Sequence, residues 1–176
     1  EECRLRDVPT SCHDTPKDID SSCPFLLERI LAGDTDRIRT LHQARYGTVL
    51  LPKTLFFHRK HKAFYHSLRH SIPYNANNRK AVAVLYLMSY HDALYDRFAG
   101  ESIATALTNM PLSGLDAKSY SILCLAKDIY CGTHYIDPED FTCPDILSHQ
   151  TAALTYGALL ILRYGTARSS ALRKCL

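Results

Sequence analysis

The most informative absence in this chain of 176 residues is that of acidic side chains between Asp36 and Asp92. All 18 carboxylates lie outside that interval, nine of them up to Asp36 and nine from Asp92 onward. The interval holds ten basic residues and six of the nine histidines, although the formal net charge of the whole chain is only +3. A local excess of positive charge favours an anionic partner, or an acidic surface elsewhere on the same protein.

Long apolar runs are also missing. The most apolar tract spans 150–162 and contains two threonines and a glycine, whereas a membrane-spanning helix needs about 20 apolar residues. We therefore expect no membrane span and interpret this tract as a buried core helix. The composition, with 46% apolar residues, seven glycines and eight prolines, is that of an ordinary folded domain.

The seven cysteines include no C-x-x-C pair, which argues against a zinc ribbon or a thioredoxin-type motif. We predict reduced, mostly buried thiols and a cytoplasmic protein. The alternative is a secreted protein in which disulfides tie the two ends of the chain together, with the odd number leaving one cysteine unpaired. The seven are Cys3, Cys12, Cys23, Cys124, Cys131, Cys143 and Cys175.

No segment alternates convincingly with period two, so we expect no sheet. The spacing of apolar residues, caps and prolines predicts an all-α, single-domain bundle of five to seven helices over 24–176, preceded by an irregular arm at 1–23. The main expected helices are one opened by Pro52 and stopped by Pro73, one from Asn77 or Asn78 to about residue 98, a short one at 101–109, one from Asp116 to Gly132, and one from Pro144 to Gly165.

Two pairs of histidines have metal-site spacing on the first of these helices. His58 and His61 are three positions apart, and His66 and His70 are four apart, so each pair shares a helix face. No carboxylate is available nearby as a third ligand, and cationic neighbours disfavour a bound cation. We interpret His61 as a core histidine hydrogen-bonded to a neighbouring helix, and we keep metal binding by these four histidines as the alternative.

The segment His91-Asp92-Ala-Leu-Tyr95 resembles the His-Asp-x-x-Tyr signature of secreted phospholipases A2. That resemblance implies that His91 activates water and that Asp92 holds calcium. However, the glycine-rich calcium loop of that family is absent, since no glycine lies between Gly47 and Gly100. A hydrolase using His91 and Asp92 is therefore the alternative, and a polar helix face is the preferred interpretation.

The basic tract interleaves cations with aromatic residues, a combination found in nucleic-acid-binding surfaces. Several of the aromatics follow the apolar stripe of the expected helix, which leaves mainly cations available for phosphates. Alternatively, this surface is solvated and pairs with the acids of residues 1–36. The cations that we expect to contact a partner are Arg59, Lys60, Lys62, Arg69, Arg79 and Lys80.

The stretch 55–165 resembles a family of small uncharacterised all-helical proteins of Gram-positive bacteria and their prophages. The resemblance is carried by Phe57-x-x-x-His61-x-x-x-Tyr65-x-x-Leu68, by Leu125-Ala126-x-x-Ile129-Tyr130-x-Gly132 and by Ile161-x-Arg163-Tyr164-Gly165. It implies a compact intracellular helical domain without a known activity.

Taken together, these patterns predict a non-enzymatic helical interaction protein, bacterial or phage-borne. Its basic face would bind nucleic acid or an acidic protein, and no cofactor is expected. The alternatives are the hydrolase and a secreted, disulfide-tied helical factor that binds a receptor.

Overall fold

The computed structural model describes residues 55–75, 77–98, 100–111, 113–137, 140 and 147–172, with side chains up to residue 166. These residues form an all-α domain of six helices without strands, as predicted. The expected arm at 1–23, the helices expected before residue 52 and five of the seven cysteines lie outside the described residues. No helix within the described residues is long and apolar enough to cross a bilayer.

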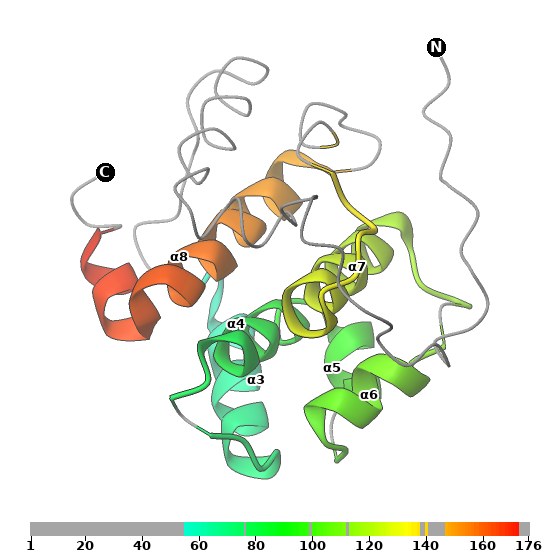
Figure 1. Cartoon of the computed structure of the whole chain (residues 1–176), viewed down its shortest axis with the longest axis horizontal. Coiled ribbons are helices and arrows are strands. Elements are labelled where there is room, and N and C mark those ends of the chain that lie inside the picture. Colours follow the sequence, from blue (N-terminus) through cyan, green and yellow to red (C-terminus); the bar gives the residue numbers. More distant parts are fainter. Residues whose placement is uncertain are drawn as a thin grey trace, which may run out of the picture.

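Helix α4 (Arg79–Met88) is the centre of the bundle (Figure 1). Every residue from Ala81 to Met88 is buried, because α4 contacts α3, α5, α7 and α8. This agrees with the prediction that this all-round apolar stretch lies centrally. The side chain of Asn78 caps the helix by accepting a hydrogen bond from the N–H of Ala81 at 3.2 Å.

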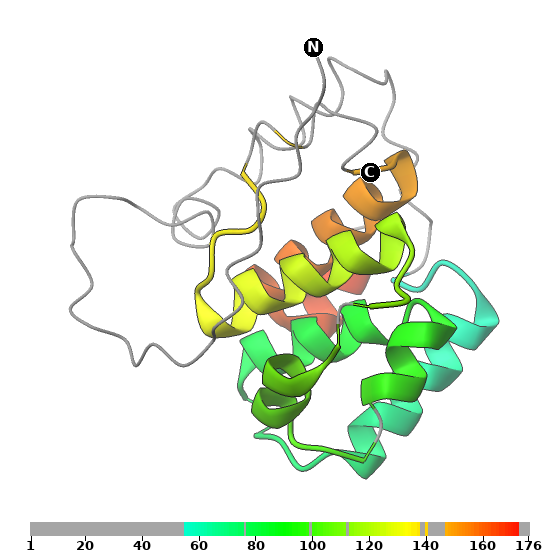
Figure 2. The same cartoon turned by 90° about the vertical axis from the view of Figure 1, so that its right-hand side faces the viewer.

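Helices α7 (Ala117–Cys131) and α8 (His149–Leu172) pack against α4 and against each other (Figures 1 and 2). Asp116 caps α7, and Gly132 ends it in the left-handed conformation at φ 74°, both as predicted. Helix α8 begins at His149, so the expected start at Pro144 was wrong. Gly165, at φ 76° and ψ 170°, is not helical, so the first helical part of α8 ends there as predicted, and a second helical part follows it up to Leu172.

Two other predicted boundaries were wrong. The helix expected from Pro52 begins only at Arg59, as α3 (Arg59–Ser71), because the His58 side chain caps it. The long helix expected to reach residue 98 is divided into α4 and α5 (Asp92–Phe98) by a turn at residues 89–91. Within that turn the Ser89 hydroxyl donates a hydrogen bond to the Tyr86 carbonyl at 2.9 Å, which competes with continuation of the helix.

Helix α6 (Ile103–Asn109) follows a turn at Gly100 and is capped by Ser102. It packs on α5 and α7 and completes the lower part of the bundle in Figure 1. Helix α3 contacts α4 along one side and touches α5 at one edge, so its remaining surface lies at the periphery of the bundle.

Candidate functional site

The outward surface of α3 carries the strongest charge pattern among the described residues. His61, Tyr65 and Leu68 face inward and are buried. On the outward side, five exposed residues are separated by steps of three, four, three and one positions, so they lie along one side of the helix. We call this surface the cationic face; it consists of Arg59, Lys62, His66, Arg69 and His70.

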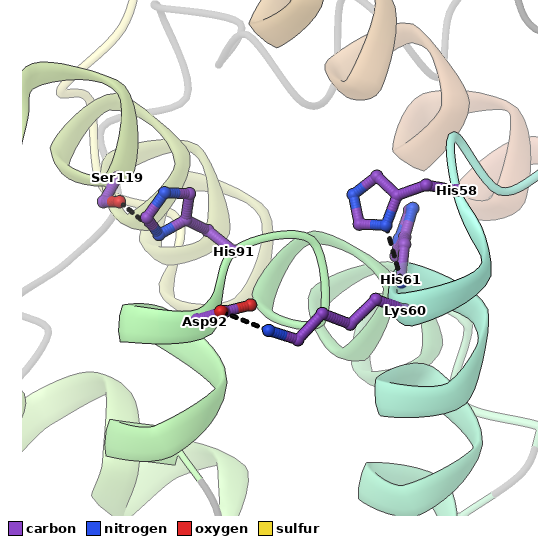
Figure 3. Close-up of polar contacts among 6 residues, drawn as sticks. All are labelled: His58, Lys60, His61, His91, Asp92 and Ser119. Carbon is purple, nitrogen blue, oxygen red and sulfur yellow. Dashed lines mark hydrogen bonds and ion pairs between the residues drawn. The ribbon is translucent and has the colours of Figure 1, made fainter.

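Lys60 does not belong to this surface, although it lies beside Arg59 in sequence. Its ammonium forms an ion pair with Asp92, the first residue of α5, and both side chains are about half exposed (Figure 3). Hydrogen bonding from Lys60 holds the pKa of Asp92 below its ordinary value, with smaller contributions from the charges of His91 and His58. The same edge of α3 stacks Phe64 on Tyr95 of α5, with 3.8 Å between ring centroids. Lys60 therefore helps to dock α5 onto α3.

Arg69 is held in place by two aromatic rings. Its Nε donates a hydrogen bond to the Tyr74 hydroxyl, and its guanidinium carbon lies 5.6 Å from the ring centroid of Tyr65 and 5.8 Å from that of Tyr74. The hydrogen bond to Tyr74 raises the pKa of Arg69 above its ordinary value, so the guanidinium stays charged. Arg69 is nevertheless an exposed residue.

Arg79 and Lys80 lie on α4, so they are not part of the cationic face on α3. Arg79 donates a hydrogen bond from Nη1 to the main-chain carbonyl of Arg163 at 2.7 Å. That carbonyl precedes the break of α8 at Gly165, where helical carbonyls lose their usual partners and attract cations. Arg79 thus stabilises the interruption of α8. Lys80 is exposed in the first turn of α4.

The four histidines suggested by spacing do not share a site. The His58 Nδ1 accepts a hydrogen bond from the N–H of His61 at 3.0 Å, which makes it the cap of α3. His66 and His70 lie on the outward side of the same helix. Within the described part of the chain, no group of three or more histidine, cysteine or acidic side chains could hold a metal ion.

His61 is a core histidine, as predicted, and it is fully buried. Its Nε2 lies 3.0 Å from the carbonyl oxygen of Tyr86 on α4, and its Nδ1 accepts from the N–H of Phe57 at 3.4 Å. A nitrogen that accepts a hydrogen bond carries no proton, so the ring is the neutral Nε2–H tautomer, which donates to Tyr86. The imidazole joins the segment before α3 to α4.

His91 contacts a serine that sequence reasoning missed. Its Nδ1 lies 3.2 Å from the Ser119 hydroxyl on α7 (Figure 3), and the N–H of Ser119 donates to the carboxylate of Asp116 at 2.8 Å. Hydrogen bonds from the hydroxyl and the N–H of Ser119 hold the pKa of Asp116 below its ordinary value. Ser119 is fully buried, so its hydroxyl is out of reach for a substrate. Asp116 and Ser119 therefore cap α7. Asp92 pairs with Lys60 and does not contribute to this group of His91, Ser119 and Asp116.

Two buried titratable groups lie farther along α7. Asp128 is 4% exposed, and burial raises its pKa to about 6 although three donors bind its carboxylate. Burial also raises the pKa of Cys124 to about 11, so this thiol is a neutral packing group at physiological pH. Neither group lies on the cationic face.

The fold and these contacts define an all-α domain with one cationic helix surface and no assembled catalytic constellation among the described residues. No protein-family description, no curated protein and no solved structure matches the chain. The resemblance to a helical family of Gram-positive bacteria and prophages therefore stays a prediction.

Proposed function

We propose that this protein is a non-enzymatic nucleic-acid-binding protein whose cationic face contacts the phosphate backbone. The proposal rests on one observation: Arg59, Lys62 and Arg69 line the outward side of α3, and no described carboxylate pairs with them. From Arg59 to Arg69 the helix rises about 15 Å, over which each strand of a duplex presents about four phosphates. A row of cations of this length complements a row of phosphates.

The chemistry of the face favours nucleic acid over an acidic protein. Interfaces between proteins usually have an apolar or aromatic centre that excludes water. The only apolar residue among the exposed positions of α3 is Ala63. Binding to a polyanion needs no such centre, because it is driven by the release of counterions from the phosphates.

The energetics of α3 also support a role for these cations in binding. Basic residues in the first turn of a helix lie next to its positive end, which is unfavourable by a few tenths of a kcal/mol each. Helix α3 has no acidic residue in that turn and instead carries Arg59, Lys60 and Lys62. Only Lys60 is compensated by a described carboxylate. Residues that are locally unfavourable and bring no structural benefit are typical of functional positions.

The test is the salt dependence of binding to a labelled DNA duplex of about 20 base pairs, followed by fluorescence anisotropy near pH 8. Three phosphate contacts predict a slope of about −2.7 in a plot of log affinity against log salt concentration. The affinity should therefore fall about 40-fold between about 50 and about 200 mM salt. Absence of binding, or a flat salt response, would refute the proposal. Binding to polyglutamate but not to the duplex would indicate an acidic protein partner instead.

Two matched charge reversals locate the surface. Arg59→Glu and Lys80→Glu each place an acid in the first turn of a helix, at exposed positions, so neither substitution should destabilise the fold. We expect Arg59→Glu to weaken duplex binding about tenfold or more, and Lys80→Glu to weaken it far less. Equal losses for the two variants would contradict the assignment to α3.

A further inference from the structure

Arg69 differs from the other cations of the cationic face because its side chain is already ordered. The Tyr74 hydroxyl accepts a hydrogen bond from Arg69 Nε, and the rings of Tyr65 and Tyr74 both lie within cation–π distance of the guanidinium. Tyr65 is 2% exposed, and Tyr74 packs half-buried against the core, so both rings are themselves fixed. The side chains of Arg59 and Lys62, by contrast, form no hydrogen bond, ion pair or cation–π contact with the described residues.

The hydrogen bond to Tyr74 leaves the useful part of the guanidinium accessible. An arginine has five N–H donors in a planar fork, and Nε supplies only one of them. The Tyr65 hydroxyl also interacts with the guanidinium, and the N–H groups on Nη1 and Nη2 that neither tyrosine engages remain for a ligand. This geometry matches two oxygens of a phosphate, which an arginine fork can bind through two parallel hydrogen bonds.

Ordering before binding changes affinity in a predictable way. A flexible side chain that is immobilised on binding weakens the complex by about twofold to tenfold. Arg59 and Lys62 lose this freedom when they bind a phosphate, whereas Arg69 has lost it in the free protein. Arg69 should therefore contribute more affinity than a cation of equal charge elsewhere on the face.

We propose that Arg69 is the anchoring phosphate-binding residue of the cationic face and that Tyr74 is the residue that positions it. This assignment rests on the proposed binding of nucleic acid. It goes further in naming one preordered arginine fork, with the phosphodiester group of the backbone as its ligand.

The decisive variant is Tyr74→Phe, which keeps the ring and every charge but removes the acceptor of the Arg69 hydrogen bond. We expect duplex affinity to fall about twofold to tenfold, while the slope against log salt concentration stays unchanged because no cation is lost. Tyr130→Phe, at another half-buried tyrosine but on α7, is the matched control and should bind as the wild-type protein does.

Arginine substitutions separate charge from positioning. Arg69→Lys keeps the charge, so it should lower affinity to a similar degree as Tyr74→Phe without changing the salt slope. Arg69→Ala and Arg59→Ala should each reduce the magnitude of the salt slope by about 0.9, and Arg69→Ala should lose more affinity. Circular-dichroism melting curves establish that each variant is folded.

The outcomes distinguish this assignment from the proposed function. Steep salt-dependent binding by the wild-type protein, together with unchanged affinity in Tyr74→Phe and Arg69→Lys, would overturn the role of Tyr74 and leave the proposed function intact. Equal losses for Arg59→Ala and Arg69→Ala would overturn the role of Arg69 as the anchor. A wild-type protein that does not bind the duplex would overturn both.

Discussion

Asp128 connects α7 to the segment that follows it, and its carboxylate should make the stability of the protein fall as the pH rises. Its Oδ1 accepts hydrogen bonds from the Thr133 hydroxyl at 2.8 Å and the Tyr135 N–H at 3.0 Å, and its Oδ2 accepts from the Ile136 N–H at 3.0 Å. Burial outweighs these donors and raises the pKa of Asp128 from an ordinary value of 3.8 to about 6.

The direction of the pH effect follows from this shift. Below about pH 4 the carboxyl is protonated in both the folded and the unfolded chain, and its contribution to stability is fully present. Between 3.8 and about 6 the unfolded chain releases the proton while the folded protein retains it. Stability is therefore lost as the pH rises through about 6. The gap corresponds to about 3 kcal/mol, at roughly 1.4 kcal/mol per pH unit.

The assay is urea unfolding of the wild-type protein and of Asp128→Asn at about pH 4, 5, 6 and 7. The amide cannot be charged, so the difference in free energy of unfolding between the two proteins isolates the ionisation of Asp128, including its electrostatic interaction with His134. The variant should be less stable by about 1–2 kcal/mol near pH 4, where its NH₂ group replaces an acceptor of the Ile136 N–H. Near pH 7 it should be the more stable protein.

The control is Asp96→Asn, which alters an exposed carboxylate on α5. Its difference from the wild-type protein should change much less over the same pH range. The reasoning would be refuted if the difference in free energy of unfolding between Asp128→Asn and the wild-type protein stays constant, or if the variant becomes relatively less stable as the pH rises. Either result would show that the three hydrogen bonds outweigh burial.

Two further predictions concern the contacts that fix α3 and α7. His61→Leu should lower the free energy of unfolding by about 1–3 kcal/mol, because it removes the acceptor of the Phe57 N–H and one of two donors to the buried Tyr86 carbonyl. The accessible charges of the cationic face are unchanged. Thermal melting measures the stability, and duplex titration measures the binding. A loss of binding without a loss of stability would place His61 in the interface. Asp116→Ala should cost about 1 kcal/mol near pH 7, since it removes the cap of α7. Because the pKa of Asp116 is held low, its contribution is present at neutral pH and lost as the pH falls, so the cost should shrink in acid, and a cost that grows in acid would contradict this.

Local sequence signals predicted the features that depend on neighbouring residues. Asn78, Asp116 and Gly132 mark helix ends because capping and left-handed glycine conformations involve only one turn of chain. The burial of the stretch from Ala81 to Met88 followed from its lack of polar residues. His61 could be assigned to the core because it repeats with Tyr65 and Leu68 along one helix side.

Local signals failed where a helix boundary depends on contacts between helices or on an uncommon capping residue. Residues 79–98 contain no proline or glycine, so nothing in the sequence divided α4 from α5. The division depends on the Ser89 hydroxyl and on docking of α5 against α3 through Phe64 and Tyr95. The start of α3 at Arg59 likewise depends on the ring of His58, a residue that is a less common cap than serine or aspartate.

The sequence by itself determined that the described domain is helical, that α4 is central and that positive charge collects between residues 37 and 91, since composition and periodicity are local properties. Which of those charges remain available was decided only by the tertiary structure. Lys60 meets Asp92 across 32 positions, and Arg79 meets the Arg163 carbonyl across 84. Such pairs form because packing brings distant helix ends together. The burial of His61, Tyr65 and Leu68 against the bundle leaves Arg59, Lys62 and Arg69 on the outward side of α3.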